Sequence, residues 1–296
     1  MKYPILIVTY NRPERLKDFL NKFGHLDREI YIGVDKYVKD EKLGSDYMNA
    51  YKTIEKKYRN NKNIKFMFST HHLGGKYSTP HFTTQAFNLT EKLIIMDDDL
   101  LFNEDFLKYC DFCLDYFEND KNIYTIEGFN PTKYSSTDDI IFYTSYPLQL
   151  GWATWEDRWK KYTNDLSQEG YLTIFKNLVS KFRFDILSII FWFVQLYKSE
   201  KNHVDGWDWY HFYNQFKNDS KSIIYNKNLV LHDGFGEESL NMHGKNNEIF
   251  KNMKLEKFKL DSEINRSLNK EFEKEIKNKY FGISLYGFVE KVKNLL

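Results

Sequence analysis

Short apolar runs alternate with amphipathic segments through the first hundred residues. Runs rich in branched or aromatic side chains predict strands at residues 5–8, 29–34, 64–68 and 93–96. Between them, apolar side chains recur at helical spacing, which predicts helices after Pro13 and at about 47–58 and 79–89. This alternation predicts an α/β fold, with a mostly parallel sheet covered by helices on both faces.

The second half of the chain has a different pattern. Helix-like stretches at 170–198, 206–218 and 256–279 outnumber clear strands, and residues 228–231 are strand-like. The sequence has no internal repeat, no low-complexity block and no linker rich in Gly, Ser or Pro. We expect one compact unit with a main domain at 1–244 and a helical extension at 245–296. The main domain would consist of two halves: one of the nucleotide-binding type at about 1–100, and a more elaborate one at about 101–244.

Composition narrows the class of protein. Apolar residues make up 42% of the chain, aromatic residues 18%, and only 5 of the 296 residues are proline, which excludes disordered and collagen-like chains. The 43 Lys and Arg residues balance 42 Asp and Glu residues, so no overall charge draws the protein to nucleic acid. Cys110 and Cys113 are too few for a disulfide scaffold and predict buried thiols in a reducing compartment. Because the apolar run at 4–8 is too short for a signal peptide, we expect a cytoplasmic protein.

Three adjacent carboxylates, Asp97, Asp98 and Asp99, follow the short apolar strand at 93–96 directly. Ligands of open α/β sheets collect at the carboxyl ends of strands, and a divalent cation with oxygen ligands would relieve the repulsion among these charges. In an extended chain Asp97 and Asp99 would face one way and Asp98 the other. The alternative is a solvated acidic turn ahead of a helix at about 103–117, where the helix dipole favours acids.

Two common phosphate-binding patterns are absent. The chain contains neither G-x-x-x-x-G-K-[ST] nor G-x-G-x-x-G, which argues against a P-loop or a dinucleotide-binding turn. An α/β sheet with aspartates at a strand end and no glycine-rich phosphate loop would neutralise phosphate through a metal. This combination indicates nucleotide-sugar chemistry.

Five segments carry motifs that belong together. They are the run at 5–13 that ends in Thr9-Tyr10-Asn11-Arg12-Pro13; Asp97-Asp98-Asp99-Leu100 with Asp105-Phe106-Leu107; Leu150-Gly151-Trp152 with Trp159; Gly206-Trp207-Asp208-Trp209; and Gly234-Phe235-Gly236-Glu237-Glu238. In this order they resemble the motifs of GT-A-fold glycosyltransferases, whose sheet is Rossmann-like. The resemblance is to the N-acetylglucosaminyltransferase I-like group and related bacterial family 2-type sugar transferases.

The resemblance implies an inverting, metal-dependent transfer of a hexose or N-acetylhexosamine from a nucleotide diphosphate sugar, most simply a UDP-sugar. It implies that Asp99 binds Mn²⁺ or Mg²⁺ and that Asp208 is the catalytic base. The implied donor-binding residues are Thr9, Arg12, Asp35, Asp97, Asp98, Gly151 and Trp152. The implied acceptor-binding residues are Trp207, Glu237 and Glu238. The acceptor would be a glycan, a glycoprotein or a lipid-linked saccharide in bacterial polysaccharide or glycoconjugate assembly.

Several of these residues have a structural alternative. Asp208 has capping-box spacing behind Asp205 and could cap a helix. His232 follows the strand-like run at 228–231 and could complete the metal shell, as a late histidine does in several GT-A enzymes, or be a hydrogen-bonded structural histidine. The tryptophans could pack in the core, and Glu237 and Glu238 could end a solvated loop.

The chain departs from the family's motifs at two places. The first acid of the triplet is Asp97, where the family has Glu, so the resemblance does not identify the donor sugar. Gly206 precedes Trp207, and only one acid lies between the two tryptophans, which makes the match of Asp208 looser.

Two stretches raise the question of membrane contact. Residues 184–197 are strongly apolar but too short to span a bilayer, and predict either a buried helix or a docking surface. Residues 281–296 place apolar side chains at helical spacing beside lysines, which fits an amphipathic helix on the inner face of the membrane or a helix packed on the core.

Two rivals to the glycosyltransferase remain open. A sugar nucleotidyltransferase also pairs such a fold with acids at strand ends, but it usually carries a Gly- and Arg/Lys-rich loop after the first strand. A non-catalytic module that binds a nucleotide or a sugar is the rival from another class.

Overall fold

The computed structural model describes residues 2–132, 140–163, 165–166, 169–201, 206–232 and 253–284. Its strands are β1 (Ile5–Thr9), β2 (Ile30–Val34), β3 (Ile64–Phe68), β4 (Lys92–Asp97), β5 (Leu100–Phe102), β6 (Ile123–Glu127), β7 (Ile140–Thr144), β8 (Trp152–Trp155), β9 (Lys221–Tyr225), β10 (Val230–His232) and β11 (Glu263–Leu268). Its helices are α1 (Pro13–Phe23), α2 (Glu41–Tyr58), α3 (Gly74–Ala86), α4 (Glu104–Tyr116), α5 (Glu156–Trp159), α6 (Tyr171–Phe182), α7 (Ile186–Glu200), α8 (Asp208–Lys217), α10 (Lys270–Glu275) and the π-helix η1 (Ile276–Tyr280).

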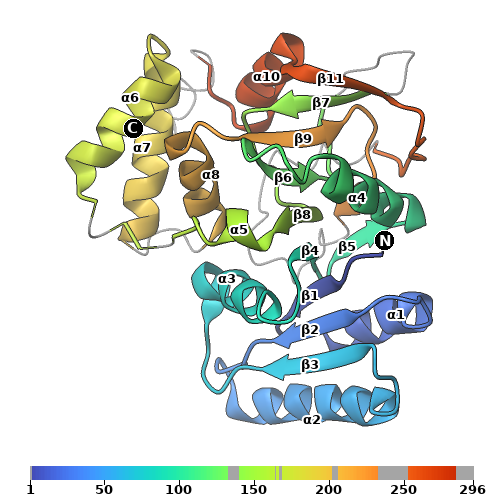
Figure 1. Ribbon diagram of the computed structural model, residues 1–296. Helices are drawn as coiled ribbons and strands as arrows, with labels where there is room; N and C mark the ends of the chain where they lie inside the picture. Colours follow the sequence, from blue (N-terminus) through green and yellow to red (C-terminus); the bar gives the residue numbers. More distant parts are fainter. Residues whose placement is uncertain are drawn as a thin grey trace.

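One large sheet runs through both halves of the chain (Figure 1). Its strand order is β3-β2-β1-β4-β8-β6-β9-β7-β11, and β5 pairs with β10 in a separate two-stranded sheet. β1 is parallel to both β2 and β4, whereas β8 is antiparallel to both β4 and β6. The carboxyl ends of β1, β4 and β6 therefore lie at the same edge of the sheet. Strand order reverses at β1, the kind of position where open α/β sheets bind ligands.

Helices cover both faces of this sheet because the strand side chains alternate. Ile5 and Ile7 of β1 pack in a core with α1, α2 and α4, while Leu6 and Val8 pack on the other face with α3. Farther along the sheet, Phe142 of β7 lies in a second core with α6, α7, α8 and α10. The predicted fold class, a mostly parallel α/β sheet with an elaborate helical second half, is confirmed.

Most predicted elements of the first half are confirmed, with shifted ends. The helix expected at 79–89 begins earlier, at Gly74, and the helix expected at 47–58 begins at Glu41. The predicted buried thiols are also confirmed: Cys110 and Cys113 are both fully buried on α4, and burial raises the pKa of each thiol.

The second half differs more from the expected pattern. The stretch at 170–198 is two helices, because the chain turns between them at Arg183, which has φ 50°. The helix expected at 256–279 is wrong in its first part, since residues 263–268 form the edge strand β11 beside β7. Edge pairing with a strand more than a hundred residues away leaves no local periodicity to detect. The expected domain boundary after residue 244 lies outside the described residues and stays a prediction.

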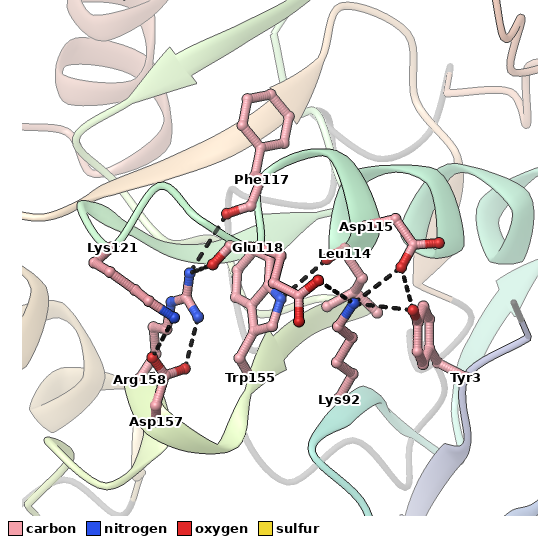
Figure 2. A network of polar contacts seen from close by, with 10 residues as sticks. All are labelled: Tyr3, Lys92, Leu114, Asp115, Phe117, Glu118, Lys121, Trp155, Asp157 and Arg158. Atoms are coloured by element: carbon pink, nitrogen blue, oxygen red, sulfur yellow. Dashed lines mark hydrogen bonds and ion pairs between the residues drawn. The ribbon is translucent and has the colours of Figure 1, made fainter.

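Two buried cations fasten the sheet to the end of α4 (Figure 2). The ammonium of Lys92, at the start of β4, donates to Asp115 Oδ1 at 2.9 Å and pairs with Glu118 Oε2 at 3.2 Å. The guanidinium of Arg158, only 2% exposed, lies over the Trp155 ring and donates to the backbone carbonyl of Glu118 at 2.6 Å. Both contacts lie at the edge of the sheet opposite to the carboxyl end of β4.

We predict that Arg158→Met lowers the free energy of unfolding by about 2–4 kcal/mol, because it leaves buried carbonyls at the end of α4 without their donor. Urea unfolding of the purified variant measures this loss. Lys121→Met is the control: Lys121 pairs with Asp157 in the same network at 59% side-chain exposure, and its loss should cost less than about 0.5 kcal/mol. Equal losses of unfolding free energy in the two variants would contradict the structural role assigned to Arg158.

Candidate functional site

The three aspartates lie at the predicted position, where β4 ends next to β1. Strand β4 includes Asp97, and Asp98 and Asp99 form a turn that leads into β5. The expectation that Asp98 faces away from Asp99 is wrong, because the chain turns after Asp97 and both carboxylates reach one guanidinium. The solvated-turn alternative does not fit either, since the side chains of Asp98 and Asp99 are only 8% and 15% exposed.

Residues from the end of β1 hold these carboxylates. Arg12 Nη1 donates to Asp99 Oδ2 at 2.7 Å and to Asp98 Oδ1 at 3.3 Å. Thr9 Oγ1 donates to Asp98 Oδ2 at 2.6 Å and also lies 2.7 Å from the Tyr51 hydroxyl. The loop after β1 and the turn after β4 are therefore one charged unit at the point where strand order reverses.

His232 joins this unit from a distant part of the sequence. Because β10 pairs with β5, His232 lies opposite Leu100 in the ladder. Its Nε2 is 3.6 Å from Asp99 Oδ2, and its side chain is 11% exposed. The structure thus brings together the two residues expected to ligate a metal.

Crowding changes the proton affinity of the aspartates. Burial, and then the charges of Asp99 and Asp98, raise the pKa of Asp97 to about 8. Burial also raises the pKa of Asp98 to about 6, although hydrogen bonds from Thr9 and Arg12 oppose that rise. The positive charge of Arg12 does not by itself balance the three aspartates, so a further cation beside them would be stabilised.

Asp208 approaches from the second half of the chain. It is the first residue of α8, and its charge contributes to the raised pKa of Asp97. Trp207 stands at the N-cap position of α8 and its side chain makes no capping bond. The capping alternative, in which Asp205 caps the helix, stays open. Gly206 leaves room for the carboxylate: a Cβ there would lie 2.4 Å from Asp208 Oδ1. Asp205 lies outside the described residues.

Asp35, at the end of β2, has a structural task. Its carboxylate accepts hydrogen bonds from the backbone N–H groups of Leu73 and Gly74 at 2.9 and 3.0 Å, and from Ser69 Oγ at 3.1 Å. It therefore holds the loop that leads into α3. Its expected contact with a nucleotide stays a prediction.

The expected sugar-binding tryptophans are mostly buried. Trp152 and Trp207 are 1% and 8% exposed and stack at 5.4 Å between ring centroids. The fully buried His211 lies against both rings. Neither of its ring nitrogens has a hydrogen-bond partner within the described part of the chain, and burial lowers its pKa to about 3. Gly151, with φ 67°, allows the close approach of Val230, whose Cγ2 would lie 2.8 Å from a Cβ there. Donor or acceptor contact by these residues stays a prediction.

Sequence reasoning missed Glu127, the last residue of β6. It is 1% exposed, pairs in the ladder with Trp152, and accepts a hydrogen bond from the backbone N–H of Gln149 at 3.0 Å. Burial raises its pKa to about 7. The sequence signal for Glu127 is the same as for Asp97: an acidic residue directly follows an apolar run.

Two expected acceptor-binding residues and the expected metal site complete the comparison with the sequence. Glu237 and Glu238 are outside the described residues. Within residues 2–132, 140–163, 165–166, 169–201, 206–232 and 253–284, no group of three or more His, Cys, Asp or Glu side chains is placed to hold a metal by itself. Within that part of the chain, Asp99 and His232 are the candidate pair of metal ligands, and a bound metal would need further ligands beside them.

Comparison with known proteins finds distant likenesses, among them two solved structures. No family model matches the chain, and no curated protein matches its sequence. A solved mannosyltransferase of Pyrobaculum calidifontis, in complex with GDP-Man and Mn²⁺, is similar over 59% of this chain at 13% identity with a TM-score of 0.39; the likeness spans about half of that protein, 51%. A 4-diphosphocytidyl-2C-methyl-D-erythritol synthase of Anaerococcus prevotii is similar over 83% of this chain and 92% of that one, at 12% identity with a TM-score of 0.35. Likenesses this distant leave the question of function to the residues of the chain.

We predict that Glu127 makes stability depend on pH. Because its pKa is about 7 in the folded chain and near its ordinary value of 4.5 when unfolded, its contribution is full below pH 4.5 and is lost as pH rises to 7. The difference corresponds to about 3 kcal/mol. Glu127→Gln should therefore gain stability relative to the native chain by up to that amount between pH 4.5 and 8.

Urea unfolding at a series of pH values measures the effect. Glu14→Gln is the control, because the Glu14 side chain is 76% exposed and solvated in both states. A constant difference between Glu127→Gln and the native chain across this pH range would show that the folded carboxyl titrates normally.

Proposed function

We propose that this protein is a metal-dependent, inverting glycosyltransferase that moves a sugar from a nucleotide diphosphate donor, a UDP-sugar, to a hydroxyl of a glycan or glycoconjugate. The observation that carries the proposal is the convergence of Arg12, Asp97–Asp99 and His232 at the point where strand order reverses, with Asp208 within electrostatic range of Asp97. Each of these residues lies within, or directly beside, one of four sequence motifs that resemble those of GT-A enzymes. Their meeting in space is independent support for reading the motifs together.

The donor set fits a divalent ion. Mg²⁺ takes one or two protein carboxylates and completes its shell with water and substrate phosphates, and Mn²⁺ also accepts imidazole nitrogen. Asp99 and His232, with ligand atoms 3.6 Å apart, would supply the protein ligands. When bound, the ion would offset the negative charge that builds on the departing diphosphate.

The other residues would bind and orient the substrates. Arg12 already spans Asp98 and Asp99 and would turn toward the diphosphate as a cation takes its place beside Asp99. Thr9 keeps Asp98 in a fixed orientation, which suits hydrogen bonding to a donor hydroxyl. Asp97 is one methylene shorter than the Glu of related enzymes and would leave a slightly deeper donor pocket.

Asp208 would act as the base. It would accept the proton of the acceptor hydroxyl as that oxygen attacks the anomeric carbon and the bond to the diphosphate breaks. Its position at the start of α8 favours the ionised form, because the N-terminus of a helix carries partial positive charge.

We predict that Asp99→Asn weakens binding of UDP in the presence of Mn²⁺ by at least about tenfold, because it removes a charged ligand of the metal. Thermal unfolding with UDP, with and without Mn²⁺, measures metal-linked stabilisation. The control is Asp46→Asn, which changes an exposed carboxylate on α2. If the native chain gains no metal-linked stabilisation, the non-catalytic module becomes the better account.

Asp208→Asn should lower turnover by roughly 10²–10⁴ while UDP binding with Mn²⁺ is kept, because general-base help acts on the reaction and not on the nucleotide. Release of UDP from a panel of UDP-sugars, by slow hydrolysis without acceptor, provides the assay. Unchanged release by the folded variant would exclude Asp208 as the base. Release of pyrophosphate from UTP and a sugar 1-phosphate would instead identify a nucleotidyltransferase.

A further inference from the structure

The outer side of the α6–α7 hairpin exposes a dense set of large apolar side chains. Of the seventeen exposed large hydrophobic residues in the described part of the chain, nine lie between residues 171 and 197. Phe184, between the two helices, is 96% exposed, and Ile186 is 66% exposed. We name this set the hairpin face: Tyr171, Leu172, Phe175, Val179, Phe184, Ile186, Ile190, Val194 and Tyr197.

The hairpin face is separate from the core-facing sides of the two helices. On α7, residues 186, 190, 194 and 197 recur at helical spacing and share one side. Ile189, Trp192 and Leu196 of the same helix are buried in the second core. The helix therefore already buries one apolar stripe and presents another to solvent.

The two helices form one continuous outer surface. Tyr171 of α6 contacts Tyr197 of α7 with ring centroids 5.4 Å apart, and Phe175 contacts Phe193 at 5.6 Å. In Figure 1, α6 and α7 lie side by side at the left edge of the molecule, with α8 between them and the sheet. The hairpin face thus belongs to the outermost layer of the second half.

The exposed charges of the hairpin all have the same sign. Lys176, Arg183, Lys198 and Lys201 are exposed and basic. The two acids between residues 171 and 201 are both in ion pairs, Asp185 with Lys277 and Glu200 with Lys76 at 3.6 Å. A hairpin that exposes apolar side chains together with only basic charges is complementary to the interface of an anionic bilayer, where lysine stems lie along acyl chains and their ammonium groups reach the headgroups.

We propose that the hairpin face docks on the surface of an anionic phospholipid bilayer, with Phe184 inserted deepest. The hairpin lies in the interface and does not cross it: α7 has 15 residues and is about 22 Å long, against a hydrocarbon core of about 30 Å. Among the helices that the structure describes, none is long and apolar enough to span a membrane.

The charge argues against two other occupants. A second copy of the chain, paired through this hairpin about a two-fold axis, would bring the four basic residues of one hairpin close to those of the other. Residues 285–296 of the chain carry two lysines and one glutamate, so they offer no net negative charge to the hairpin face either. An anionic lipid surface would accommodate both the apolar side chains of the hairpin face and the basic residues of the hairpin.

Docking in this way would also narrow the acceptor class, a consequence that rests on the proposed function. α8 contacts both hairpin helices and begins with Asp208. A docked hairpin would hold the candidate base near the bilayer, which favours an acceptor carried on a membrane lipid.

Vesicle flotation of the full chain, without donor or acceptor, tests the docking independently of catalysis. The native chain should float with vesicles that contain phosphatidylglycerol and stay unbound with pure phosphatidylcholine. Phe184→Ser combined with Ile186→Ser should lower the partition coefficient by about tenfold or more, because both side chains are exposed and would lose their lipid contacts. Lys176→Gln combined with Lys198→Gln should lower it about fivefold for each lysine.

The matched control is Leu89→Ser combined with Leu260→Ser, which removes side chains of 52% and 66% exposure outside the hairpin and should leave flotation unchanged. Absence of flotation of the native chain, or equal flotation of the hairpin and control variants, would overturn the proposal. So would loss of flotation in Phe288→Ser with Val292→Ser while the hairpin variant still floats, since the C-terminal segment would then be the lipid contact. A concentration-dependent dimer that the hairpin substitutions abolish, without lipid binding, would assign the face to a second copy.

Discussion

The repulsion among three carboxylates at the end of β4 is the constraint on which the site depends. Asp97, Asp98 and Asp99 are held largely out of water, and one guanidinium is shared between the last two. Burial and mutual repulsion raise the pKa of Asp97 and Asp98, so the fully ionised group is favoured only where opposite charge is supplied. Arg12 supplies part of that charge in the structure, and a metal bound with a diphosphate would supply the remainder on the proposed function.

Sheet topology creates this environment. β4 lies between β1, which contributes Thr9 and leads to Arg12, and β8, which begins with Trp152. The strand order reverses at the ends of β1 and β4, the kind of position where open α/β sheets bind ligands, while the opposite edge of β4 is closed by the buried cations Lys92 and Arg158. One edge of the sheet is thus built for stability and the other carries the unbalanced charge.

The second half of the chain adds groups to a site that the first half begins. β10 pairs with β5 and brings His232 to Asp99, and α8 brings Asp208 within electrostatic range of Asp97. The same half presents the hairpin face on its outer side. Under the two proposals, one helical layer would provide both the catalytic base and the contact that keeps the enzyme beside its acceptor.

Most strands and helices of the first half, and the position of the acid triplet, could be predicted from the sequence, because the burial of regular elements repeats at short intervals along the chain. The same signal, an acid directly after an apolar run, is present at Glu127, but it was not used there. Three features required the folded structure: Asp98 and Asp99 both reach Arg12, Asp35 is engaged by the loop before α3, and β11 is an edge strand. Each of these depends on contacts between residues far apart in the chain, and such pairings leave no periodicity in the local sequence.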